Sequence, residues 1–145
     1  MAVISTGCFP VNNITFEVET ADSTFSTIAD MESANITVDT GVETWFSITD
    51  GGWQKALATS KSFSIDMAGK RSIGDAGNDF IADKWNKNGQ ECNANFQITF
   101  PNGDKLTFEG VIQITSMWGG DATNVAGLEF TVLCNGEPEY TKATA

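Results

Sequence analysis

The residue types that carry out most protein chemistry are scarce in this sequence. It has no histidine, which excludes histidine general bases, Ser-His-Asp triads and the commonest zinc geometries. Cys8, Cys92 and Cys134 form no Cys-x-x-Cys pair, and no Gly-x-Ser-x-Gly motif marks a serine nucleophile. We interpret the cysteines as reduced thiols that act as small core residues. The sequence therefore predicts no enzyme and no cofactor.

A cluster of acidic side chains could still bind a cation. Asp75, Asn78, Asp79 and Asp83 supply oxygen ligands of the kind that calcium prefers. Their spacing is not that of an EF-hand loop, and helix capping explains Asp75 and Asp79 better. We therefore predict no metal site.

Tryptophans could form a sugar-binding platform, although they serve more often as core or interface anchors. Trp45, Trp53 and Trp118 are the candidates for such a platform. A non-catalytic β-sandwich module that binds carbohydrate is therefore the alternative function.

The charge of the chain is strongly negative and unevenly distributed. Among the 145 residues, 19 are acidic and 8 basic, a net charge of −11. Residues 1–54 hold eight acidic groups and no basic one, whereas residues 55–145 hold eleven acidic and eight basic. This acidity argues against a protein that grips nucleic acid through its phosphates. It is compatible with a merely acidic surface, or with acidic and basic faces that stack head to tail.

The elements that would position these residues are mostly strands. Alternation of apolar and polar residues predicts strands over residues 14–19, 35–39, 42–49 and 61–67. Residues 20–34 and 50–60 are predicted to be long loops. The length favours a single domain over residues 1–145. No apolar run approaches the roughly 18 residues that span a bilayer, and residues 1–6 do not resemble a signal peptide.

One segment has helical rather than strand spacing. Asp75 suits an N-cap, Ile81 and Trp85 are four residues apart, and Gly89 is a natural stop. We predict one short helix over about residues 76–88, with Asp83 and Lys87 paired and Trp85 docked in the core.

The hairpin around Pro101-Asn102-Gly103 is specified by its turn residues. A three-residue loop with a left-handed glycine sets Ile98 opposite Leu106, whereas a two-residue loop would set apolar against polar residues throughout. The second arm of the hairpin runs from Lys105 to about Trp118, roughly 45 Å, and residues 124–134 return beside it. Strands this long favour a wall that is shared between subunits.

The run from Ser60 to Arg71, followed by Ile73-Gly74-Asp75-Ala76-Gly77-Asn78-Asp79-Phe80, resembles the tail tube (major tail) proteins of bacteriophages, above all those of Gram-positive hosts. It is also similar to the tubes of phage-tail-like bacteriocins. The resemblance extends over residues 30–135 and includes the order of helix, hairpin and long strand. Residues 1–30, the N-terminal arm, match only loosely.

The resemblance implies a mainly β fold: an antiparallel β-sandwich or partial barrel with one short flanking helix and long inter-subunit loops. It also implies hexameric rings that stack into a tail tube, the conduit through which DNA passes during ejection without specific binding. The expected partners are further copies of the chain and tail proteins such as the tape measure and terminator, with no membrane. The expected location is the virion tail, assembled in the host cytoplasm.

In such a tube, the polar face of the strands over residues 94–131 would line the lumen. The residues expected there are Asn95, Gln97, Thr107, Glu109, Gln113, Thr115, Glu129 and Thr131. Four basic residues are expected to meet acidic loops of a neighbouring subunit or ring: Lys55, Lys61, Lys70 and Arg71.

Overall fold

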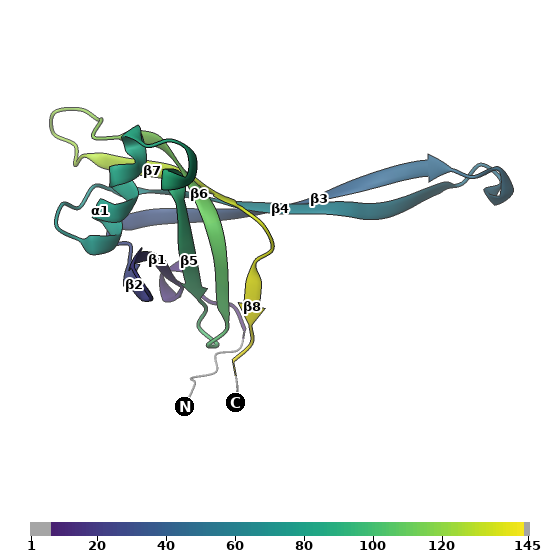
Figure 1. The fold of residues 1–145 in the computed structure, drawn as a ribbon, viewed down its shortest axis with the longest axis horizontal. Helices are drawn as coiled ribbons and strands as arrows, with labels where there is room; N and C mark the ends of the chain where they lie inside the picture. Colours follow the sequence, from purple (N-terminus) through teal and green to yellow (C-terminus); the bar gives the residue numbers. More distant parts are fainter. Residues whose placement is uncertain (1–6, 144–145) are drawn as a thin grey trace.

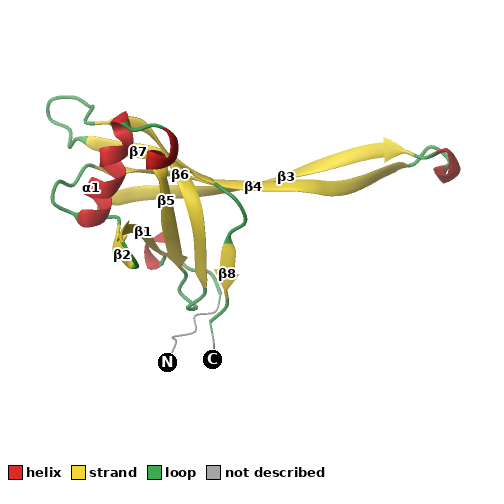
Figure 2. Cartoon of the chain, viewed as in Figure 1, coloured by secondary structure: helices red, strands yellow, loops and turns green. Residues whose placement is uncertain are grey.

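Eight antiparallel strands form one sheet with a single α-helix beside it, in a computed structural model that describes residues 7–143 (Figures 1 and 2). The strands are β1 (Thr15–Ala21), β2 (Thr24–Thr27), β3 (Met31–Phe46), β4 (Gln54–Lys70), β5 (Asn93–Thr99), β6 (Lys105–Met117), β7 (Gly127–Cys134) and β8 (Glu139–Thr141). The helix is α1 (Ala76–Ala82), and short 3-10 turns span Val11–Asn13, Ile48–Asp50, Asp83–Asn86 and Gly89–Cys92.

The sheet curls so that one of its faces packs against itself. The strand order is β2-β1-β5-β6-β7-β4-β3, and β8 pairs with the start of β6. Although β1 and β4 are far apart in this order, Phe16 and Met67 line the same cavity. Side chains of one face, joined by the helix, form the core: Val18, Ile28, Ile65, Met67, Ile81, Ala82, Ala94, Phe96, Ile98, Phe108, Ile112, Leu128, Phe130 and Val132. The predicted fold class is confirmed: a mainly antiparallel β fold with one short helix.

The predicted hairpin between β5 and β6 is confirmed in its loop and its register. Ile98 lies opposite Leu106 and Phe96 opposite Phe108. Gly103 has a φ of 92° and donates its N–H to the carbonyl of Phe100 at 2.9 Å. The turn residues therefore set which face of both strands enters the core.

The helix is shorter than predicted and its far end turns outward. After Ala82 the chain tightens into the 3-10 turn Asp83–Asn86. Ile81 is fully buried, but Trp85 is 56% exposed, because the tighter turn breaks the four-residue spacing that would have aligned the two. The prediction that Trp85 belongs to the core was wrong, and Gly89 begins another 3-10 turn rather than ending the helix.

Two segments predicted to be loops are largely strands. Residues 20–34 include β2 and the start of β3, and residues 50–60 include the first seven residues of β4. The strands predicted over residues 35–39 and 42–49 fall within the single strand β3, except that β3 ends at Phe46 and a 3-10 turn begins at Ile48. β3 and β4 pair continuously, apart from two irregularities, from Met31 opposite Gly69 to Phe46 opposite Gln54. The long connection is therefore a two-stranded ribbon.

Candidate assembly surfaces

Seven of the eight residues expected to line a lumen share one face of the sheet, opposite the core, and the eighth, Thr115, lies at a bulge in β6. Asn95 lies opposite Glu109, Gln97 opposite Thr107, and Gln113 opposite Thr131. Each of the eight is exposed or half-exposed, and more buried residues alternate with them along the strands except after Thr115, where Ser116 is exposed as well. A bulge in β6 places Ser116, rather than Thr115, opposite Glu129. The face is thus wet in the single chain, as a lumen wall would require.

This polar face extends beyond the strands that the sequence singled out. Glu17 of β1 pairs with Gln97, and Asp66 of β4 pairs with Thr131. Glu19 joins them, because the Asn95 amide donates to its carboxylate at 2.9 Å. The alternation of β1 and β4 marked these carboxylates as solvent-facing, but the pairing of distant strands was needed to place them on this face.

Neutral donors hold four carboxylates of the polar face. Besides the Asn95–Glu19 bond, the Thr131 hydroxyl donates to Asp66 at 2.7 Å and the Asn135 amide to Glu109 at 3.0 Å. A fourth bond, from Gln97 to Glu17, measures 3.3 Å. The three ion pairs found within residues 7–143 use other carboxylates. These four side chains are therefore oriented by neutral groups rather than by basic ones.

The second surface is an arm, which we define as residues 38–62 of β3, β4 and their connecting turn. β4 pairs with β7 only over Ser64–Lys70, so the arm has no third strand, and it projects far from the rest of the chain, the body (Figure 1). Large apolar side chains are exposed along it: Val38, Val42, Trp45, Phe46, Ile48, Trp53 and Leu57. An isolated two-stranded ribbon is marginal in water, and exposed apolar patches mark interaction sites.

The uneven charge of the sequence does not become two oppositely charged ends. The acidic segment around β3 and the basic segment that begins at Lys55 are antiparallel partners, so their charges lie side by side. Lys55, for example, pairs with Asp50 within the arm at 3.2 Å. The idea of an acidic face opposed to a basic face is therefore corrected to a ribbon of mixed charge.

The four basic residues expected at interfaces lie in different settings. Lys55 and Lys61 are on the arm, where the Lys61 ammonium donates to Thr40 at 3.4 Å. Lys70 lies at the opposite end of β4 and pairs with Glu32 at 3.3 Å. Arg71, with 15% of its side chain exposed, is engaged within the chain.

A polar clamp formed by the buried Asn78 and the partly buried Arg71, Asp75 and Asp79 attaches the helix to the sheet. The Asn78 amide donates to the carbonyls of Ala29 and Lys70, both at 3.0 Å, and accepts from Arg71 at 2.9 Å. Arg71 also bonds Asp79 at 2.7 Å, and this bond lowers the pKa of the Asp79 carboxyl. Asp75 caps the helix by accepting from the Asn78 N–H. The clamp explains these acidic residues without a metal.

A similar contact fixes the end of the chain. Asp104 accepts hydrogen bonds from the Tyr140 hydroxyl and from the Ala143 N–H. The bond from Tyr140 is the main reason that the pKa of Asp104 is lowered. β8 is thereby held along the first residues of β6.

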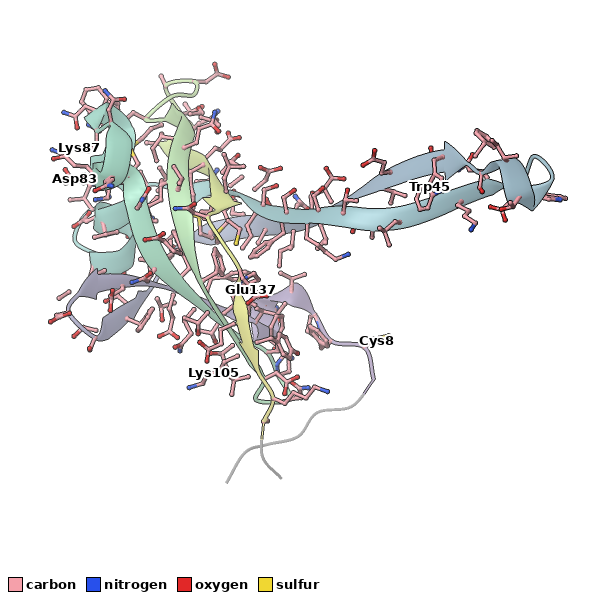
Figure 3. All side chains as sticks on the ribbon, turned by 45° about the vertical axis from the view of Figure 1, so that its right-hand side comes forward. Cys8, Trp45, Asp83, Lys87, Lys105 and Glu137 are labelled. Carbon is pink, nitrogen blue, oxygen red and sulfur yellow. The ribbon has the colours of Figure 1, made fainter. Side chains whose placement is uncertain are left out.

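The three tryptophans proposed as a sugar platform do not form one surface, because Trp118 lies far from Trp45 and Trp53. Trp45 lies on the outer part of the arm (Figure 3) and Trp53 follows the turn at its end. Trp118 instead lies in the body, where its ring meets Trp85 edge-on with centroids 5.4 Å apart. The geometry therefore does not support the carbohydrate-binding alternative.

Other candidate chemistry is also limited in the described chain. Cys8 is exposed and Cys92 and Cys134 are half-buried, so the expectation of three core thiols was wrong. Within residues 7–143 no three His, Cys, Asp or Glu side chains are grouped to hold a metal ion. No helix in this part of the chain is long and apolar enough to cross a membrane.

Comparison with known proteins gives this fold a family. A sequence model of the phage tail tube protein family matches residues 12–140. No match was found among curated protein sequences.

Solved structures share the fold at low sequence identity. A chain from the virion of a native gene transfer agent particle superposes with a TM-score of 0.70 at 21% identity, covering 92% of this chain and 99% of that one. A chain from the tail of an empty gene transfer agent particle, with C6 symmetry, gives 0.68 at 22%, with the same coverage. A chain from the anti-feeding prophage baseplate gives 0.56 at 14%, covering 96% and 98%.

Proposed function

The chain belongs to the phage tail tube protein family, and on that premise we propose that its copies form six-membered rings that stack into a tube. Its role is structural and not catalytic. The arm is the observation that supports self-assembly most directly, because apolar side chains that a lone chain leaves in water would be covered by a neighbour. The C6 symmetry of the similar gene transfer agent tail supports six copies per ring.

We assign the polar face to the lumen. Its predicted members are wet in the single chain, and four of its carboxylates are hydrogen-bonded by neutral donors rather than by basic side chains. A lumen wall of this kind would repel the phosphates of DNA, so DNA would pass without binding. The remaining partners in this proposal are the tape measure and terminator proteins, in a virion tail assembled in the host cytoplasm.

We place three of the four basic residues, Lys55, Lys61 and Lys70, at contacts between subunits. Each side chain is near the surface and could add an acidic partner from a neighbour. Arg71 would contribute chiefly by holding the helix, since its guanidinium already bonds Asn78 and Asp79. Single rim pairs are worth about 0–1 kcal/mol, so their effect would depend on repetition around the ring.

Electron microscopy of the concentrated, purified chain tests this function. Rings or tubes with six-fold symmetry are expected, and a chain that stays monomeric at every concentration would refute the proposal.

The assignment of the polar face to the lumen is tested separately by the variants Glu109→Lys and Glu129→Lys. Tubes of these variants should retain short DNA duplexes that wild-type tubes exclude, and equal exclusion by both would refute the assignment.

A further inference from the structure

The end of the arm carries three strongly exposed apolar side chains, including that of Ile48, the most exposed large apolar residue of the described structure. We define this tip as residues 46–53. Phe46 is 67% exposed, Trp53 is 80% exposed, and Ile48 is fully exposed. Gly51 and Gly52 both adopt positive φ, which lets the turn close tightly while these side chains point into solvent. The tip makes no contribution to the core of its own chain.

An aromatic hollow lies at the opposite end of the sheet. Its volume is about 550 Å³, and its lining combines Ile73, Phe80, Trp85 and Trp118 with the charged side chains Arg71, Asp79 and Asp83. Ile73 is 86% exposed, and the two tryptophans are more than half exposed. Their edge-on rings form one wall. Wide aromatic surface near solvent is the usual composition of an interface centre.

The register places the hollow far from the tip along the same strand. Trp118 follows Met117, the last residue of β6. Met117 pairs with Leu128 of β7, and Leu128 pairs with Gly69 near the end of β4. The tip precedes Gln54 at the start of β4. Seventeen residues of strand separate the two ends, roughly 55 Å. Tip and hollow of one chain therefore cannot meet.

The backbone at the hollow is strained in a way the fold does not require. Trp118 has a φ of 70°, an uncommon conformation for a bulky residue. Its N–H bonds the Gly127 carbonyl at 2.9 Å, which holds the indole beside Trp85. Glycine or asparagine would occupy this turn at lower cost, so the presence of tryptophan indicates a use for its ring.

We propose that the tip of one copy docks in the Trp85–Trp118 hollow of a second copy. This inference rests on the proposed function, because stacked copies supply the second chain. The two surfaces lie at opposite ends of one rigid sheet, which is the arrangement of a head-to-tail contact that repeats. The arm extends roughly 35 Å past the body, so copies stacked along it must overlap. The apolar tip then removes both tryptophans from water.

A photo-crosslinking amino acid at position 53 of the full chain tests the contact. Irradiation of assembled protein is expected to link position 53 to peptides that contain Trp85 or Trp118 of another copy. Position 38, which is also exposed but lies at the base of the arm, is the matched control and should not reach those peptides. Crosslinks from position 53 to another segment of an assembled neighbour would overturn the inference while leaving the proposed function intact. A chain that never assembles would overturn both.

A second variant separates docking from folding. Trp118→Gly removes the ring and relieves the left-handed backbone, so the melting temperature should not fall. The concentration needed for assembly is expected to rise at least about tenfold, as for other interface tryptophans. Val11→Ala, an exposed apolar side chain away from both surfaces, should leave that concentration unchanged. Unaltered assembly of Trp118→Gly would overturn the inference.

Discussion

The body and the arm are built from the same two strands, yet they depend on different partners. Within the body, β4 lies between β3 and β7, and its core-facing residues Ile65 and Met67 are almost fully buried. Within the arm, β4 pairs only with β3, and Leu57 on that stretch is exposed. The body therefore satisfies its apolar side chains internally, whereas the arm leaves its own exposed in the single chain. If a second copy covers them, as proposed, folding and assembly would depend on separate parts of one continuous ribbon.

Removing the arm should have the largest effect, because it is expected to abolish assembly while leaving the body folded. Residues 40–61 can be replaced by Asn-Gly, because Asp39 and Ser62 lie opposite each other and that dipeptide suits a two-residue hairpin turn. No core residue lies in the deleted segment, so the free energy of unfolding should change by less than about 1 kcal/mol. Assembly should be lost, as judged by sedimentation. Persistent rings or tubes would show that the arm is dispensable.

A matched pair of phenylalanine truncations separates the two regions at single-residue scale. Phe130→Ala empties a fully packed position in the body and should lower the free energy of unfolding by about 3–5 kcal/mol. Phe46→Ala, on the arm, should change it by less than about 0.5 kcal/mol but weaken assembly. Denaturant unfolding and sedimentation measure the two effects. Equal destabilisation by both changes would contradict the division.

The polar clamp should be the next most sensitive part of the body. Asn78→Ala leaves the carbonyls of Ala29 and Lys70 without their side-chain donor and removes one of the two side-chain acceptors of Arg71. An expected loss of about 2–3 kcal/mol in the free energy of unfolding follows from buried polar groups left unsatisfied. Thr40→Ala, on the arm, is the control and should be nearly neutral. Thermal unfolding measures both variants, and a larger loss of stability in Thr40→Ala than in Asn78→Ala would contradict the prediction.

Acid should weaken the body through the same clamp. The pKa of Asp79 is lower in the folded chain than its ordinary value of 3.8, chiefly because Arg71 donates to it. Asp79 therefore stabilises the folded state fully at a pH above 3.8, its pKa in the unfolded chain. This stabilisation is lost as the pH falls through the lower pKa of the folded state. Unfolding measured from pH 6 down to pH 2 should show this decline. Asp79→Asn should be less stable at neutral pH and should show a shallower decline, and an unchanged slope would contradict the assignment.

The smallest effect is expected at the ion pair within the arm. Lys55 and Asp50 are 3.2 Å apart, and half of the lysine side chain is exposed. Lys55→Gln should therefore alter the free energy of unfolding by less than about 1 kcal/mol. A larger change in assembly than in stability would assign Lys55 to an interface, as proposed. Repeating both measurements at high salt provides the control, because screening should abolish the difference.

Local chemistry made the body largely predictable. The β5–β6 hairpin followed from Pro101-Asn102-Gly103, since a turn of that type fixes which residues face the core. The shared polar face of the residues that we assign to the lumen followed from alternation along the same strands. Trp85 was misplaced because the helix tightens after Ala82, which sequence spacing does not reveal.

The arm was much less predictable, because its structure depends on pairing between segments. Lys55 to Ser60 lack a clear alternation and were expected to form a loop, but β3 holds them as a strand.

The role of Arg71 in the clamp was likewise unforeseen. Its partners Asn78 and Asp79 lie in the helix, and which charge satisfies which is decided by packing rather than by composition.

The continuity of β4 from arm to body also sets how the chain would bear a mechanical load. A pull on the arm along its axis is transmitted by one covalent strand to the seven residue pairs that join β4 to β7. The pairs succeed one another along the direction of the pull, and their hydrogen bonds run across it. A pull therefore shears these hydrogen bonds together rather than opening them one at a time. The tensile strength of the arm's anchorage is therefore that of the whole ladder.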